Sequence, residues 1–201
     1  MKLIAHSFIS SKGAFLNGSC IVACNETDEN FLKYIYTELK SDYPKFYKMD
    51  NLSKMAFLAD SLLQDMIPVD KDQENKLNLI MANASSSVKT DLKFIDSYSN
   101  LGNPSPSLFV YTLPNILNGE LSIRHKWYGE NSFFILESFD AQFFVDQIQF
   151  SFNRGNELCI CGWIESPAIG NEECFLFLVS NEGESLSPVS IMNILNGYRN
   201  E

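Results

Sequence analysis

The chain has 201 residues, of which 45% are hydrophobic and 20% are charged, a composition that argues against an intrinsically disordered protein. Its 25 acidic and 15 basic residues give a net charge of −10, which argues against binding to nucleic-acid backbones or anionic membrane surfaces. We predict a single domain over residues 1–201, because the length suits one core. The N-terminal residues make a poor signal peptide and no apolar run reaches membrane-spanning length, so we expect a cytoplasmic protein.

Apolar runs and helical spacing alternate along the chain, which predicts a layered α/β protein. Two short apolar runs within residues 1–25 predict two strands or a loose hairpin. Thr27 or Asp28 can cap the first helix, Asp50 or Asn51 can cap the second, and the charged segment 69–76 is expected to be a surface loop. The other elements are predicted as helices at 31–39 and 50–64, a strand at 77–82, a helix from Thr90, a helix at 141–153, strands at 158–164 and 173–179, and a helix at 188–198.

The segment from Ser105 to Ser138 is the most informative part of the chain. Ser105 is expected to cap a helix with Pro106 at its first position, where the missing N–H is harmless. Pro114 should kink or interrupt that helix, because it removes a backbone donor. Gly119 indicates a turn or a close backbone approach.

The apolar run 132–136 is typical of a buried strand, and a polar tip follows it. Strand tips that lead into a helix are where α/β proteins carry their chemistry. Glu137 and Asp140 at this tip form either an acid/base pair or a helix-capping arrangement, which is the more common role. Ser138 is a candidate nucleophile only if a base lies within hydrogen-bond reach.

Few residues favour metal or nucleotide chemistry. His6 and His125 are the only histidines, and neither has a ligand partner at a helical or turn spacing, so we predict no metal site. The glycine patterns that cradle phosphates are missing, so we expect no cofactor. The five cysteines are interpreted as core thiols: Cys20, Cys24, Cys159, Cys161 and Cys174.

Several segments resemble the N-terminal half of a β-ketoacyl synthase, an enzyme with the thiolase fold. The segments 43–54 and 85–91 are similar to early signatures of that family, and 158–165 is similar to the strand after the nucleophile helix. The resemblance covers roughly residues 30–180 and implies a mixed central sheet with helices on both faces. The matching central residues keep the family's spacing without a gap: Ser105, Pro106, Leu113, Pro114, Asn115, Gly119, Ile123, Arg124, His125, Gly129 and Asn131.

Two departures from the family pattern imply a subunit without independent activity. Ser138 matches the cysteine that carries the acyl chain, and Glu137 replaces the small residue before it. A thiolate, rather than a hydroxyl, is the nucleophile suited to forming that thioester. The family's two catalytic histidines belong to a C-terminal half that this sequence does not contain. The chain therefore resembles a chain-length factor, in particular the short type associated with aryl-polyene and flexirubin-type pigment pathways.

In that family the strand before the nucleophile joins two subunits into one sheet. The resemblance thus implies a dimer strand formed by Phe133, Phe134, Ile135 and Leu136, whose apolar character suits an interface. The expected partner is a full-length β-ketoacyl synthase. An acyl carrier protein would be engaged indirectly, because it and this chain are both acidic.

The resemblance also places four side chains near the partner's acyl tunnel, where bulky groups would limit chain length: Leu108, Phe109, Tyr111 and Thr112. Such a role requires shape and no proton transfer. Two alternatives stay open. One is a small acyltransferase or thioesterase that uses Ser138, and the other is a homodimeric acyl-binding protein.

Overall fold

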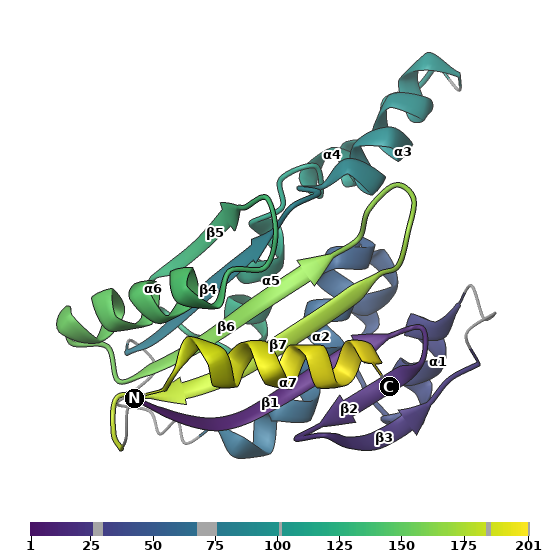
Figure 1. Cartoon of the computed structure of the whole chain (residues 1–201). Helices are drawn as coiled ribbons and strands as arrows, with labels where there is room; N and C mark the ends of the chain where they lie inside the picture. Colours follow the sequence, from purple (N-terminus) through teal and green to yellow (C-terminus); the bar gives the residue numbers. More distant parts are fainter. Residues whose placement is uncertain (26–29, 68–75, 101, 184–185, 201) are drawn as a thin grey trace.

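The computed structural model describes residues 1–25, 30–67, 76–100, 102–183 and 186–200. These residues form a mixed seven-stranded sheet in the order β3-β2-β1-β7-β6-β4-β5 (Figure 1). β4 runs parallel to both of its neighbours, and the other neighbouring strands are antiparallel. The strands are β1 (Lys2–Ser10), β2 (Gly13–Leu16), β3 (Ser19–Ala23), β4 (Leu77–Asn83), β5 (Asn131–Ile135), β6 (Leu158–Glu165) and β7 (Glu173–Ser180).

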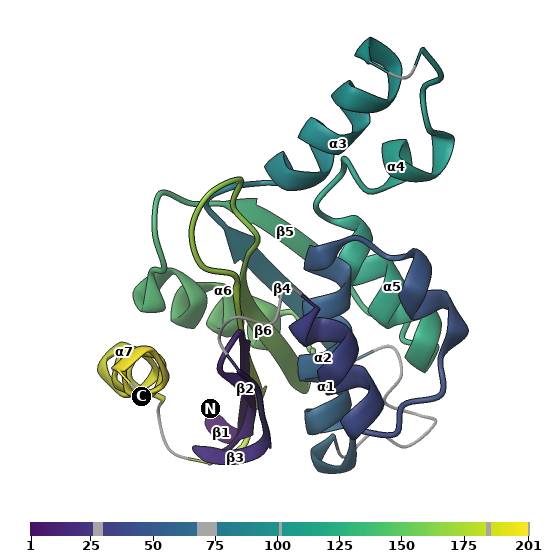
Figure 2. The same cartoon turned by 90° about the vertical axis from the view of Figure 1, so that its right-hand side faces the viewer.

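Helices cover both faces of this sheet (Figure 2). α1, α2 and α5 lie on one face, whereas α6 and α7 lie on the other. α3 and α4 project beyond the end of β4 and pack mainly against each other. The α-helices are α1 (Phe31–Glu38), α2 (Asn51–Leu63), α3 (Val88–Ser99), α4 (Pro106–Val110), α5 (Ile116–His125), α6 (Ala141–Asn153) and α7 (Pro188–Asn200), with short 3-10 helices η1 (Pro44–Lys48) and η2 (Gln64–Met66).

Two apolar cores form because successive strand side chains point to opposite faces. In β6, Ile160 and Ile164 face the core under α2, whereas Cys161 and Trp163 face the core under α6 and α7. β7 alternates in the same way, and the central residues of both strands are fully buried. Cys159, Cys161 and Cys174 lie in these cores, as predicted. The prediction of core thiols is wrong for Cys20, which is exposed on the edge strand β3, and for Cys24, which is half-buried just after that strand ends.

The predicted α/β class is confirmed, and so are most of the elements. Asp50, Ser105 and Asp140 each accept a backbone N–H at the start of a helix, which confirms three predicted caps. Pro114 separates α4 from α5, as expected. The caps considered at Thr27 and Asp28, and nearly all of the charged segment 69–76, lie outside the described residues.

Three predictions about local structure are wrong. The first 25 residues form three strands rather than two, because the short run Gly13–Leu16 pairs with both β1 and β3. The helix expected from Thr90 begins earlier, at Val88. Gly119 lies inside α5, where an added Cβ would meet nothing within 4 Å beyond its own helix, so it marks neither a turn nor a close approach.

A true close approach occurs at Gly162 in β6. An added Cβ would lie 2.4 Å from Leu176 Cδ2 and 2.5 Å from Met81 Sδ. Gly162→Ala is therefore expected to lower the free energy of unfolding by about 1–3 kcal/mol through overpacking. Gly119→Ala is the matched control and should raise it by up to about 1 kcal/mol, because alanine is the better helix former. Urea unfolding followed by circular dichroism measures both, and an unchanged stability of Gly162→Ala would contradict the packing.

Candidate functional site

β5 forms one edge of the sheet. It pairs in parallel with β4, where Met81 lies opposite Phe133 and Asn83 opposite Ile135, and no described strand lies on its other side. Leu136 N donates to Asn83 O at 2.9 Å. Because backbone groups alternate along a strand, the N–H groups of Phe133 and Ile135 face the open edge.

The side chains of this strand are less buried than the sequence predicts. Phe133 and Phe134 are half-buried, and Ile135 is 54% exposed. Phe134 packs edge-on against Phe143 of α6, with ring centroids 4.9 Å apart. The prediction of a buried strand is wrong for the isolated chain, because β5 has a neighbour on one side only. An exposed apolar edge of this kind is a template for pairing with another strand.

A projecting element lies at the same end of the sheet. We call residues 88–113 the arm; it contains α3, the connecting segment and α4, and it starts shortly after β4 ends opposite Ile135 (Figure 2). Phe94 and Phe109 hold its two helices together, with ring centroids 5.4 Å apart. Ser97 Oγ accepts a hydrogen bond from Ser105 N at 3.1 Å. The arm thus has an internal structure of its own.

Large apolar side chains on the arm face solvent. A surface helix of a monomeric protein normally turns its apolar stripe toward a core, and contiguous exposed apolar patches mark interaction sites. Among the described residues of the arm, the exposed large apolar ones are Leu92, Ile95, Tyr98, Phe109, Val110 and Leu113.

The four residues expected near a partner's tunnel lie in or beside α4, and they differ in exposure. Phe109 is 57% exposed, and Leu108 and Thr112 are half-buried. Tyr111 instead points into the fold, where its hydroxyl donates to the buried Glu120 Oε1 at 2.9 Å. The tunnel role of these residues stays a prediction, and Phe109 is the one most available to another protein.

Tyr111 and Glu120 belong to a buried polar cluster beneath the arm. Burial and the adjacent Glu120 carboxylate raise the pKa of Tyr111, so its hydroxyl stays protonated and donates. Lys45 Nζ lies 2.7 Å from Glu120 Oε2 and compensates the buried charge. This cluster connects the end of α4 with α5 and η1.

Ser138 and Glu137 are exposed at the tip that follows β5. Asp140 Oδ1 accepts the Phe143 N–H at 3.0 Å, so this carboxylate caps α6, in agreement with the capping interpretation. A groove of about 410 Å³ opens between the first turns of α6 and α7. Its lining includes Ser138, Phe139, Ala141, Pro188, Val189 and Met192.

Neither histidine is available as a base for Ser138. His125 Nε2 lies 2.6 Å from Asp60 Oδ2, and His125 stacks on Trp127, on the face of the sheet opposite α6. His6 Nδ1 bonds with the Tyr198 hydroxyl at 2.7 Å. Tyr198 lies near the C-terminal end of α7, roughly 14 Å along the helix from Val189 in the groove. Burial lowers the pKa of His6.

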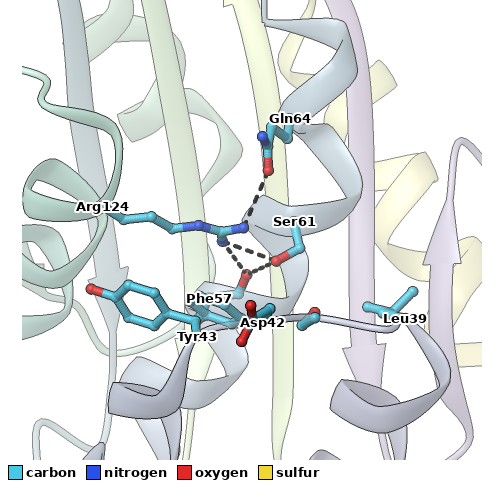
Figure 3. Close-up of a pocket in the computed structure, with 8 residues that line it drawn as sticks. Leu39, Asp42, Tyr43, Phe57, Ser61, Gln64 and Arg124 are labelled. Carbon is cyan, nitrogen blue, oxygen red and sulfur yellow. Dashed lines mark hydrogen bonds between the residues drawn. The ribbon is translucent and has the colours of Figure 1, made fainter.

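The matched residues Arg124 and His125 have a structural role. Both bind the fully buried Asp60 of α2, with Arg124 Nη1 3.0 Å from Asp60 Oδ2. Figure 3 shows Arg124 reaching across a pocket of about 300 Å³ to Ser61 and Gln64, and its guanidinium lies 4.0 Å from the centre of the Phe57 ring. Sequence reasoning missed Asp60, although a lone carboxylate among the inward-facing residues of helix 50–64 was the available signal.

In the part of the chain that the structure describes, no three His, Cys, Asp or Glu side chains gather in a way that could hold a metal ion. No described helix is both long and apolar enough to cross a membrane.

No family model matches the sequence, and no curated protein matches it. Solved structures do match. The first is a ketosynthase (ApeO) in complex with its chain length factor (ApeC) from Xenorhabdus doucetiae, with a TM-score of 0.59 and 12% identity over 91% of this chain and 81% of that chain.

Two further matches have similar scores. The ishigamide ketosynthase/chain length factor gives a TM-score of 0.57 and 16% identity. A type II PKS acyl-carrier protein in complex with its ketosynthase (AntDE:AntF) gives 0.56 and 15%. Each covers 89% of this chain and about three-fifths of the other, 61% and 62%.

The chain has the ketosynthase fold. The thiolase-like architecture inferred from the sequence is thereby confirmed, with identities low enough that the likeness concerns the fold alone. Within this ketosynthase fold, the open strand β5 and the arm expose apolar side chains at the same end of the sheet, and Ser138 occupies an exposed tip.

We predict that Ser138 does not form an acyl-enzyme, because no histidine lies near enough to remove its proton. Incubation with acyl-CoA or a fluorophosphonate, followed by intact-mass spectrometry, should show no adduct. Ser138→Cys controls for access: an exposed thiol near the start of α6 should be alkylated readily by iodoacetamide. A wild-type adduct that disappears in Ser138→Ala would overturn the prediction.

Proposed function

We propose that this chain is a non-catalytic, chain-length-factor-like subunit that pairs with an active β-ketoacyl synthase and shapes its acyl tunnel. The observation that carries the proposal is the junction of β5 and the arm. An open strand edge ends at the base of an element whose apolar side chains face solvent. Both features are unfavourable for a monomer, and one partner would cover both.

The pairing proposed for β5 is a continuous sheet across two subunits. The outward N–H groups of Phe133 and Ile135 would donate to a partner strand, and Ile135 would be buried in the process. The arm would then extend over the partner. Phe109 is the arm side chain proposed to limit the length of the growing chain, with Leu108 and Thr112 beside it.

A role that shapes the partner's acyl tunnel without catalysis agrees with the surroundings of Ser138. The chain offers this serine no base, so decarboxylation and condensation would be the task of the partner. An acyl carrier protein would dock mainly on that partner, because the net charge of −10 repels another acidic protein. We place the complex in the cytoplasm and in fatty-acid or polyene biosynthesis of the aryl-polyene or flexirubin type.

The open edge of β5 also favours a second candidate, a homodimer with an acyl-binding role. Two copies of an exposed apolar edge strand can pair with each other. Sedimentation of the isolated protein, combined with mass spectrometry for bound acyl species, separates this candidate from the first. A stable homodimer that excludes the synthase would favour it.

Ile135→Pro tests the proposed strand pairing. The substitution removes an N–H that faces the open edge and takes part in no bond with β4, so the fold should persist. Association with the complete ketosynthase encoded nearest to this gene should weaken about tenfold or more. Ile135→Val keeps the N–H and is the matched control. Co-purification and calorimetry measure the effect, and wild-type affinity of Ile135→Pro would rule out pairing through β5.

Phe109→Ala tests the tunnel role. Phe109 is 57% exposed but packs against Phe94, so its truncation should lower the free energy of unfolding by about 1 kcal/mol. The complex with the synthase should make longer products, since a bulky group is removed. Phe150→Ala on α6, where the ring is 59% exposed, is the control and should leave product length unchanged. Identical products from wild type and Phe109→Ala, measured by mass spectrometry, would count against the proposal.

A further inference from the structure

The arm has few apolar contacts with the body of the protein. α3 packs mainly on α4, and only Thr90 and Ser97 of α3 are buried. Tyr111, at the other end of the arm, does belong to the core of the body. Packing therefore leaves mainly the direction of α3 weakly determined, because a helix without a shared apolar core can pivot about its connections. Its direction has to come from specific polar contacts at its base.

Glu172 lies at the centre of those contacts. Its Oε1 accepts hydrogen bonds from three segments that are far apart in sequence: Asn51 Nδ2 of α2 at 2.8 Å, Lys89 Nζ of α3 at 2.9 Å, and the Ser166 hydroxyl of the loop between β6 and β7. The Glu172 side chain is only 11% exposed. Figure 1 shows this loop reaching toward the base of α3.

Further hydrogen bonds connect the base of the arm to the body of the protein. Thr90 Oγ1 donates to Asp50 Oδ2 at 3.2 Å, and Asp50 also caps α2. Glu165, at the other end of the β6–β7 loop, accepts from Ala84 N and the Ser85 hydroxyl in the turn before α3. Ser87 Oγ donates to Thr112 O at 2.6 Å and closes the arm at its base.

The charge state of Glu172 fits this arrangement. Burial by itself would raise its pKa, but the hydrogen bonds from Ser166, Asn51 and Lys89 outweigh burial and lower it. The carboxylate is therefore ionised at neutral pH. A charged acceptor makes stronger hydrogen bonds than a neutral one, so the hydrogen bonds at the base of the arm are strongest when Glu172 is ionised.

We propose that Glu172 is the positioning residue that sets the direction of the arm, through Lys89, and so fixes where the arm's apolar side chains are presented. The effect of this direction on product length rests on the proposed function, because only an element that shapes a tunnel needs a fixed direction for that purpose. The direction of the arm is itself measurable on this protein alone.

The experiment uses paired spin labels at Ser99→Cys on the arm and Gln149→Cys on α6, in a Cys20→Ser and Cys24→Ser background. Electron–electron double resonance should give one narrow distance for this reference protein. Glu172→Gln keeps the shape of the side chain and removes its charge. In this variant a broad distribution of distances between the labels should replace the single narrow one. Glu173→Gln is the matched control, because Glu173 binds Arg199 of α7 instead of α3, and it should keep the narrow distance.

Lys89→Met provides an independent variant, since Lys89 is the α3 residue that donates to Glu172. It should broaden the distance as Glu172→Gln does, and the double variant should be no broader than either. A narrow distance in both Glu172→Gln and Lys89→Met, or equal broadening in Glu173→Gln, would overturn the inference.

The same variants in the complex with the synthase separate this inference from the proposed function. If the synthase binds the wild-type chain, Glu172→Gln should retain the partner and spread the product lengths. If the synthase does not bind the wild type, the proposed function fails, and the distance measurement still decides whether Glu172 directs the arm.

Discussion

The side chains of β6 and β7 alternate between two apolar cores, and this double burial is the constraint on which the rest of the molecule depends. A strand that is apolar on both faces has to lie inside a sheet that is covered twice. The α2 layer and the α6/α7 layer supply the two covers. Gly162 lies where β6 approaches Leu176 and Met81 too closely for a side chain, so the central strands fit together without spare room.

That arrangement leaves apolar surface at the far end of the sheet. β4 is fully buried between β6 and β5, whereas β5 has one neighbour and keeps Ile135 in solvent. The arm continues this uncovered region with side chains such as Phe109. The physical cost of the exposed edge and the exposed helices points to a partner, and the ketosynthase fold makes a second ketosynthase-like subunit the natural proposal.

Polar contacts determine how the peripheral elements attach to the core. Asp60 is fully buried and holds Arg124 and His125, which docks α5 onto α2. Glu172 holds Asn51 and Lys89, which joins the arm to the body. In both cases one buried carboxylate collects donors from distant segments. Removing it would leave several donors without a partner, which costs more than the bonds contribute by themselves.

Local signals in the sequence determined the helices, the caps and the central strands. Asp50, Ser105 and Asp140 cap helices as predicted, because a cap depends on residues only two or three positions apart. The spacing of the central segment also carried the resemblance to the ketosynthase fold. Pro114 interrupted the helix as its missing N–H requires.

Only the tertiary structure decided which apolar segments are covered. The run 132–136 reads like a buried strand, yet β5 lies at an edge, because sheet order depends on contacts between distant segments. Tyr111 turns inward because Glu120, on the next helix, offers its hydroxyl a buried acceptor, whereas Phe109 packs against Phe94 within the arm and stays 57% exposed. The sequence thus determined the scaffold through local chemistry. The open edge and the isolation of Ser138 from both histidines arose from long-range packing, and the base of the arm is held by polar contacts between distant segments.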